Sequence, residues 1–102
     1  MKQGDIWWVE QPNDKRRPGL ILTRDSNIGR LHDVLVAPLT TTVRGIPTEV
    51  PLGIDDGVPR DSVVNLQNVM SIPKSYLRVQ AGQIAAGRWH EVCFALRAAI
   101  AC

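Results

Sequence analysis

One arginine and one threonine are the residues of this chain best suited to do chemistry. Arg17 precedes Pro18, where a loop meets an apolar segment, and Thr40 follows Leu39 at the end of another apolar segment. A guanidinium is a planar, permanently charged fork that grips phosphate oxygens, and a hydroxyl donates one further hydrogen bond. If the two segments are adjacent antiparallel strands, these residues lie close together and suit a phosphodiester. Alternatively, Arg17 is an ordinary loop cation and the threonine only a strand former.

Positive charge is concentrated in one early part of the chain. The formal net charge is only +2, but residues 15–44 hold six cations and two acids. Such clustering is typical of proteins that bind polyanions. We expect contacts with backbone phosphates from Lys15, Arg16, Arg24, Arg30 and Arg44. A basic surface that faces solvent without a partner is the alternative.

The other familiar catalytic patterns are missing from the sequence. It contains no Gly-x-Ser-x-Gly, no glycine-rich phosphate loop and no His-Glu-x-x-His. Cys93 and Cys102 do not form a Cys-x-x-Cys pair, and neither His32 nor His90 stands at a ligand spacing from them. We therefore expect no metal and no cofactor. Because 102 residues bury only one modest core, any chemistry should lie in a surface groove or at a subunit interface.

Turn signals recur about every ten residues and separate short apolar segments. We expect strands over residues 5–9, 20–23, 34–39, 48–52, 62–66 and 69–72. Pro38 has no amide hydrogen, so its strand should end, bulge or lie at an edge there. Between Trp89 and Ile100, apolar residues recur at three- and four-residue steps, which predicts an amphipathic helix of about fifteen residues. The pattern indicates a single domain over residues 1–102, mainly β, closed by a C-terminal helix.

Membrane and export signals are also missing. No apolar run approaches the ~20 residues of a membrane-spanning helix. The run from Ile6 to Val9 is too short for a signal peptide. We expect a cytoplasmic protein that makes no contact with a membrane.

Four short blocks resemble, in order, the signature blocks of the MazF/PemK toxins, the ribosome-independent mRNA interferases of bacterial type II toxin–antitoxin pairs. The blocks are residues 4–9 (GDIWWV), 17–22 (RPGLIL), 38–41 (PLTT) and 68–72 (NVMSI). The similarity spans essentially the whole chain. It implies the CcdB/PemK-like toxin fold, a small, partly open SH3-like antiparallel barrel with a C-terminal helix, acting as a homodimer.

The resemblance also implies a reaction. It is the sequence-specific, metal-independent cleavage of single-stranded RNA, in which the 2′-hydroxyl attacks phosphorus and leaves a 2′,3′-cyclic phosphate and a 5′-hydroxyl. The substrate would be mRNA, or tRNA or rRNA, and its loss would inhibit translation and growth. A cognate antitoxin with an acidic, disordered tail would occupy the RNA groove.

The residues that the resemblance assigns to catalysis are Arg17 and Thr40. We add Thr41, Gln67 and Asn68 as candidates for RNA contacts. Many relatives carry an Asp-Gln pair where this chain has Gln67-Asn68. Any mechanism that requires a carboxylate there does not apply to this chain, but an amide can still form a hydrogen bond with a base edge.

Two other functions remain open at the level of sequence. The related CcdB toxins bind DNA gyrase and have no nuclease activity, but that family uses a C-terminal tip containing tryptophan, which this chain lacks. The other alternative is a catalytically inactive SH3-like interaction module. Strand alternation places Trp7 and Trp8 on opposite faces, so one is expected in the core and the other is a candidate for stacking on RNA.

Overall fold

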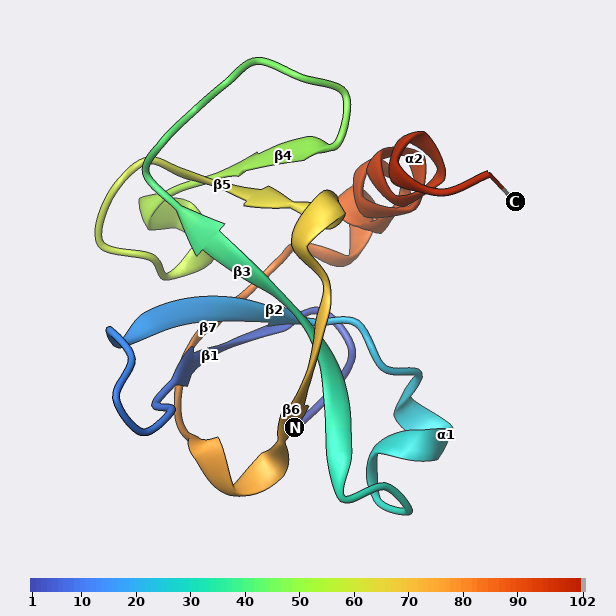
Figure 1. Cartoon of the computed structure of the whole chain (residues 1–102). Coiled ribbons are helices and arrows are strands. Elements are labelled where there is room, and N and C mark those ends of the chain that lie inside the picture. Colours follow the sequence, from blue (N-terminus) through green and yellow to red (C-terminus); the bar gives the residue numbers. More distant parts are fainter. Residues whose placement is uncertain (102) are drawn as a thin grey trace.

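The computed structural model describes residues 1–101 and consists of a curled antiparallel sheet with a C-terminal helix (Figure 1). The strands are β1 (Asp5–Val9), β2 (Arg17–Ile21), β3 (Asp33–Thr40), β4 (Glu49–Leu52), β5 (Ser62–Asn65), β6 (Met70–Pro73) and β7 (Leu77–Gln83). The helices are α1 (Asp25–Ile28) and α2 (Trp89–Ala99), with short 3-10 turns η1 (Ile54–Asp56), η2 (Leu66–Asn68), η3 (Lys74–Tyr76) and η4 (Ala86–Arg88). The predicted class, mainly β with a C-terminal helix, is confirmed.

Strand β3 runs through the middle of the sheet and changes its partner along its length. The strand order is β4-β5-β3-β2-β1-β7, and β6 also pairs with β3. On one edge, β3 pairs with β2; on the other, its first half pairs with β6 and its last two residues pair with β5. Pro38 lies between the β6-paired and β5-paired parts, where a missing amide hydrogen breaks no ladder. The strand therefore does not end at Pro38, and it reaches Thr40.

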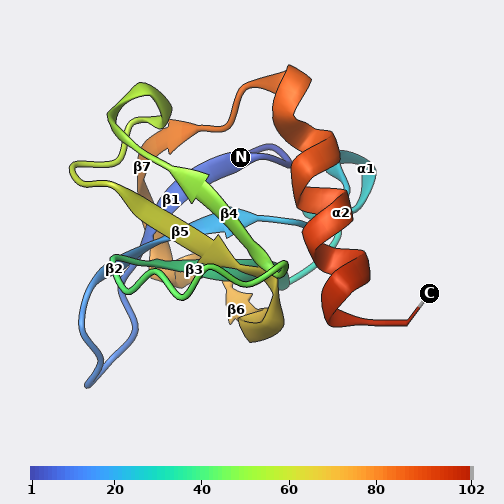
Figure 2. The same ribbon diagram turned by 90° about the horizontal axis from the view of Figure 1, so that it is seen from above.

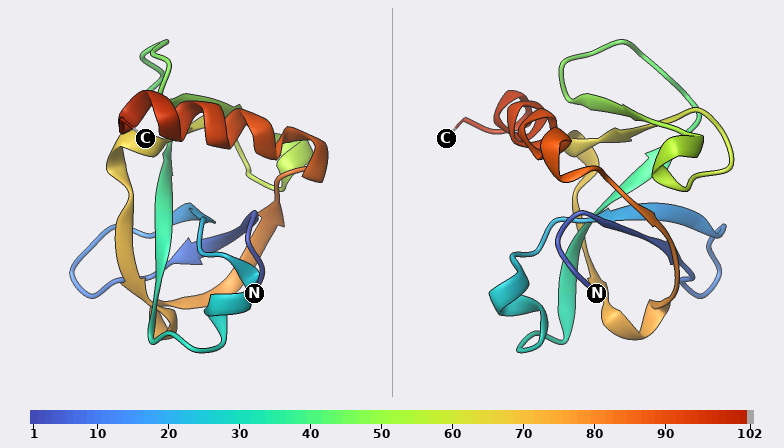
Figure 3. Two further views of the ribbon diagram at one scale, coloured as in Figure 1. Left: turned by 90° about the vertical axis from the view of Figure 1, so that its right-hand side faces the viewer. Right: turned by 180° about the vertical axis from the view of Figure 1, so that it is seen from behind.

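The curled sheet encloses apolar side chains that alternate along the strands. One cluster includes Ile6, Leu20 and Leu39 and continues to Val92 on α2. A second cluster, around Ile21 and the β6 side of the sheet, fills the other half of the barrel. Figures 2 and 3 show α2 lying along one side of the sheet. Burial alternates along β4, whereas all four residues of β5 are buried.

Helix α2 is shorter than predicted. It comprises 11 residues, and the turn η4 precedes it. Arg88 occupies its N-cap position without a side-chain cap hydrogen bond, and the Trp89 N–H bonds to the carbonyl oxygen of Ala86 in the preceding turn. No helix within residues 1–101 is long and apolar enough to cross a membrane.

The barrel closes through a loop contact and not through strand pairing. End strands β4 and β7 are not neighbours in the strand order. Instead, Gly57, which follows η1 with φ 88°, packs its backbone against Gly82 of β7. A Cβ at Gly82 would collide with the carbonyl oxygen of Asp56, so only glycine permits this approach. The loop between β4 and β5 is thereby held against the opposite edge of the sheet.

Arg88 connects this loop to the start of α2. Its guanidinium donates to Glu91 at 2.8 and 3.1 Å, to the carbonyl oxygen of Pro51 at 2.7 Å and to the buried carboxylate of Asp56 at 3.5 Å. The hydrogen bonds from Arg88 lower the pKa of Glu91, and those to Glu91 raise the pKa of Arg88. Arg88 therefore ties three separate segments together.

Replacing Arg88 with methionine should lower the free energy of unfolding by about 2 kcal/mol, because Asp56 stays buried without its cation. The pKa of Glu91 is lowered in the folded chain, so its contribution is present above about pH 4.5 and is lost as the pH falls through the lowered pKa. Urea titrations at neutral and acidic pH measure both effects. The matched variant Arg97→Met, at an exposed position in α2, should unfold like the wild type. Equal stability of the two variants would contradict the assignment.

Candidate functional site

The register between β2 and β3 brings Arg17 and Thr40 together. Gly19 pairs with Pro38 and Leu20 with Ala37. The same register continued by two residues places Arg17 opposite Thr40, and opposed residues extend on the same face with Cβ atoms about 5 Å apart. Both residues line one hollow of about 330 Å³, here called the groove. Residues that are 23 positions apart in sequence thus face one ligand-sized space.

The groove is cationic. Its lining consists of Trp8, Lys15, Arg16, Arg17, Pro18, Leu39, Thr40, Thr41, Thr42, Pro59, Arg60 and Ser62. Every charged residue in this set is a cation, and the remaining members are hydroxyl-bearing or apolar. A concave surface with charges of one sign concentrates counter-ions and so favours a polyanionic ligand.

A second hollow of about 180 Å³, here called the cleft, adjoins the groove because Arg17 and Thr40 line both. Its other walls include Arg44, Glu49 and Asn68. The Glu49 carboxylate accepts backbone N–H groups from Arg44 at 3.2 Å and Gly45 at 2.9 Å. It therefore serves to hold the loop after Thr40 in place while the arginine side chain remains at the cleft.

The Thr40 hydroxyl is poised to donate a hydrogen bond. Its oxygen already accepts the backbone N–H of Thr42 at 3.1 Å. A hydroxyl carries one donor, so its hydrogen remains available to an anion in the groove. Arg17 is exposed and forms no ion pair within residues 1–101. The Thr40 hydroxyl and the Arg17 guanidinium can therefore both donate hydrogen bonds to a ligand.

Arg16 and Trp8 form a stacked pair at the wall of the groove. The guanidinium carbon lies 4.2 Å from the centroid of the indole ring, and Arg16 also approaches the Glu10 carboxylate at 3.7 Å. One face of Trp8 is therefore covered by a cation. Trp7 packs against the second core cluster and donates its indole N–H to Asp5 at 3.3 Å. Both tryptophans are half-buried: Trp7 contacts the core and Trp8 lines the groove.

The structure does not bring all the predicted RNA-contacting residues to this site. Lys15, Arg16 and Thr41 line the groove, and Arg44 and Asn68 line the cleft. Arg24 lines a different hollow beside α2, and Arg30 is exposed after α1. Gln67 is exposed and lines neither hollow, although its backbone N–H bonds to Asn65. Contrary to the prediction, Arg24, Arg30 and Gln67 therefore lie outside the groove and the cleft. Residues that cluster in the sequence need not cluster in space.

Sequence reasoning missed two residues of the site. Arg60 reaches the groove from the loop that Gly57 and Gly82 hold against the barrel. Glu49 holds the loop beside the cleft through backbone amides. Neither residue belongs to a local sequence pattern. Arg60 lies on an irregular loop, and Glu49 acts through the backbone amides of another. Within residues 1–101, no group of three or more His, Cys, Asp or Glu side chains lies together.

The fold agrees with comparisons to known proteins. Residues 2–100 match the model of the family described as PemK-like, MazF-like toxins of type II toxin–antitoxin systems. The chain belongs to this family. The resemblance expected from the four sequence blocks is confirmed.

Individual relatives are similar over nearly their full lengths. The probable endoribonuclease MazF5 of Mycobacterium tuberculosis (strain ATCC 25618 / H37Rv) is 43% identical over 101 residues, covering 98% of this chain and 93% of the relative. Among solved structures, the Mycobacterium tuberculosis toxin MazF-mt6 superposes with a TM-score of 0.87 at 40% identity, covering 93% and 94% of the two chains. A mycobacterial endoribonuclease solved in complex with its cognate antitoxin also has a TM-score of 0.87, at 26% identity, covering 97% and 93%.

Proposed function

We propose that this chain is the endoribonuclease toxin of a type II toxin–antitoxin system and that it cleaves single-stranded RNA in the groove. Family membership supports the activity. The observation that carries the site assignment is that Arg17 and Thr40 share one cation-lined hollow. Cleavage of cellular RNA, above all mRNA, inhibits translation and growth. Because this substrate is cytoplasmic, the protein acts in the cytoplasm.

The reaction uses the ribose itself as the nucleophile. The 2′-oxygen forms a bond to phosphorus, the bond from phosphorus to the 5′-oxygen breaks, and the products are a 2′,3′-cyclic phosphate and a 5′-hydroxyl. Negative charge grows on the two non-bridging oxygens in the transition state. Arg17 clamps these oxygens with its planar fork, and Thr40 donates a further hydrogen bond.

Proton transfer is not assigned to Arg17. A guanidinium stays charged in proteins and so is a poor base. The 2′-hydroxyl loses one proton and the 5′-oxygen gains one. Water or phosphate oxygens accept the first proton and supply the second. The exposure of Arg17 leaves room for solvent beside the scissile bond.

Incubation of the purified protein with a pool of single-stranded RNAs in EDTA tests this proposal. We expect cleavage to proceed, and the new 5′ ends should accept phosphate from polynucleotide kinase without prior phosphatase treatment. The new 3′ ends should resist a ligase that requires a 3′-hydroxyl until the cyclic phosphate has been removed. A double-stranded RNA of the same sequence serves as the control and should persist. Intact single-stranded RNA, or cutting only after Mg²⁺ is added, would contradict the proposal.

The protein is further proposed to act as a homodimer under the control of an antitoxin. Large apolar side chains remain exposed in the single chain, including Leu35 at 48% and Phe94 at 66%, which favours a further protein contact. The acidic, disordered tail of a cognate antitoxin complements the cations of the groove and would exclude RNA from it. Light scattering on the purified protein measures the first of these expectations, and competition between RNA and an acidic peptide measures the second.

A further inference from the structure

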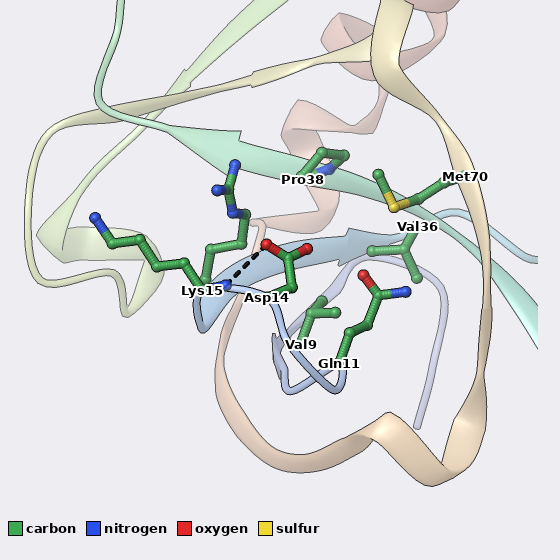
Figure 4. Close-up of a pocket in the computed structure, with 8 residues that line it drawn as sticks. Val9, Gln11, Asp14, Lys15, Val36, Pro38 and Met70 are labelled. Atoms are coloured by element: carbon green, nitrogen blue, oxygen red, sulfur yellow. Dashed lines mark hydrogen bonds between the residues drawn. The ribbon is translucent and has the colours of Figure 1, made fainter.

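A small hollow beside the groove is separate from the groove and cleft described above. It has a volume of about 120 Å³ and is here called the notch. Figure 4 shows Val9, Val36, Pro38 and Met70 around it, so that strands from both sides of the curled sheet supply an apolar floor. A closed cavity of about 150 Å³ holds a benzene ring, so a hollow of this size that opens to solvent suits one six-membered ring.

Four polar side chains line the notch: Gln11, Asp14 and Lys15 come from the loop between β1 and β2, and Arg17 comes from the start of β2. Gln11 and Asp14 belong to one turn, in which the Asp14 N–H bonds to the Gln11 carbonyl oxygen at 3.3 Å. Asn13 between them has φ 61°, the left-handed conformation that asparagine tolerates. The turn therefore presents an amide and a carboxylate to the notch from a defined backbone.

The Asp14 carboxylate has one oxygen engaged and one available. Oδ1 accepts the backbone N–H of Lys15 at 2.8 Å (Figure 4). An ionised carboxylate accepts hydrogen bonds and donates none, so Oδ2 requires a donor from any ligand in the notch. A ring that carries an amino group satisfies this requirement, whereas a ring with a carbonyl oxygen at the same place is repelled.

The notch shares Arg17, but not Thr40, with the groove. Arg17 lines the notch, the groove and the cleft alike. An RNA strand whose phosphate is held by Arg17 can therefore place a neighbouring base against the apolar floor. Bases of single-stranded RNA are free to splay out of the strand in this way and be read at their edges.

We propose that the notch receives a pyrimidine base next to the cleaved bond and that Asp14 makes the site prefer cytosine to uracil. This inference rests on the proposed function. Cytosine donates its amino group to Asp14, and the Gln11 amide donates to the acceptor edge of the same ring. Uracil places a carbonyl oxygen where cytosine has the amino group, and it would face the carboxylate.

Paired RNA substrates and one isosteric variant test the inference. The substrates differ only by C or U at a single nucleotide, placed in turn at each position flanking the cleaved bond. We expect the wild type to cleave the C form about tenfold faster at one of these positions. Asp14→Asn keeps the oxygen that bonds to Lys15 and replaces the other with an NH₂ donor, so the preference at that position should change to U.

A charge-matched control separates base recognition from general electrostatics. Asp55→Asn removes the same charge from an exposed position in η1 that lines neither the groove, the cleft nor the notch. This variant should keep the preference for C. Thermal melting verifies that both variants are folded.

The possible outcomes distinguish the assignment of the notch from the proposed function. Cleavage by the wild type with equal rates for C and U at every flanking position would overturn the assignment of the notch and leave the proposed function standing. The same holds if Asp14→Asn cleaves with an unchanged preference, or if Asp55→Asn changes the preference as Asp14→Asn does. Failure of the wild type to cut any RNA would overturn the proposed function, and the inference with it.

Discussion

The Arg17→Ala variant folds like the wild type and cleaves single-stranded RNA 10²- to 10³-fold more slowly. The rate falls because the guanidinium is the only cation that lines the groove, the cleft and the notch together, and loss of one donor to a developing anion typically costs about this factor. Folding is unaffected because Arg17 is exposed and forms no ion pair within the described part of the chain. Single-turnover cleavage of a labelled RNA measures the change in rate.

Two further variants define what Arg17 contributes. Arg17→Lys keeps the charge but loses the planar fork, so we expect most of the loss in rate to remain. Arg97→Ala removes an exposed arginine from α2, far along the chain from the groove-lining segments, and should cleave at the wild-type rate. Wild-type cleavage by Arg17→Ala would remove the site assignment, whatever the activity of the other variants.

The Thr40→Val variant should lose about 10- to 100-fold in cleavage rate at unchanged stability. Valine keeps the branched shape that suits the end of β3 but removes the hydroxyl, and a hydrogen bond to a charged group contributes about 1.5–3 kcal/mol. The same substitution also removes the acceptor for the Thr42 N–H. Cleavage rates measured beside thermal unfolding separate loss of chemistry from loss of structure.

Thr40→Ser is the informative control for this prediction. Serine restores the hydroxyl and can still accept the Thr42 N–H, so its rate should lie within a few-fold of that of the wild type. Equal rates for the valine and serine variants would show that the hydroxyl does not stabilise the transition state. The role of Thr40 would then be limited to shaping the wall of the groove.

Most strands could be predicted because their apolar residues form short runs between turn signals. The run around Val50 alternates in polarity, whereas the runs around Ile6 and Leu20 are continuously apolar, and all three residues are buried. The strand at the C-terminal side was harder to recognise. β7 (Leu77–Gln83) is largely exposed and was not predicted, although its apolar residues Leu77, Val79 and Ala81 alternate with Arg78 and Gln80.

The site was predictable only in part, for a related reason. Arg17 and Thr40 could be chosen from their chemistry and their places beside apolar strands, and the register between β2 and β3 brings them to one hollow. Arg24 and Arg30 carry the same charge in the same stretch of sequence, yet α1 and its flanking turns hold them elsewhere. The sequence shows how many charged residues a segment carries. Whether those residues line one groove depends on which loops meet in the folded chain.

By itself, the sequence determined the family, the mainly β class and the chemical identity of the two groups proposed to hold the phosphate. These are local properties, because the period of burial, the turn residues and the side-chain functional groups are all written within a few positions. Only the tertiary structure decided that Arg60 reaches the groove, that Glu49 anchors the neighbouring loop and that Gln11 and Asp14 border an apolar notch. Arg60 reaches the groove through the contact of Gly57 with Gly82, and the notch forms where residues of β1, β3 and β6 meet, so both features depend on residues far apart in the chain. Glu49 bonds to amides only four and five residues away, but the conformation of that loop has no signature in the sequence.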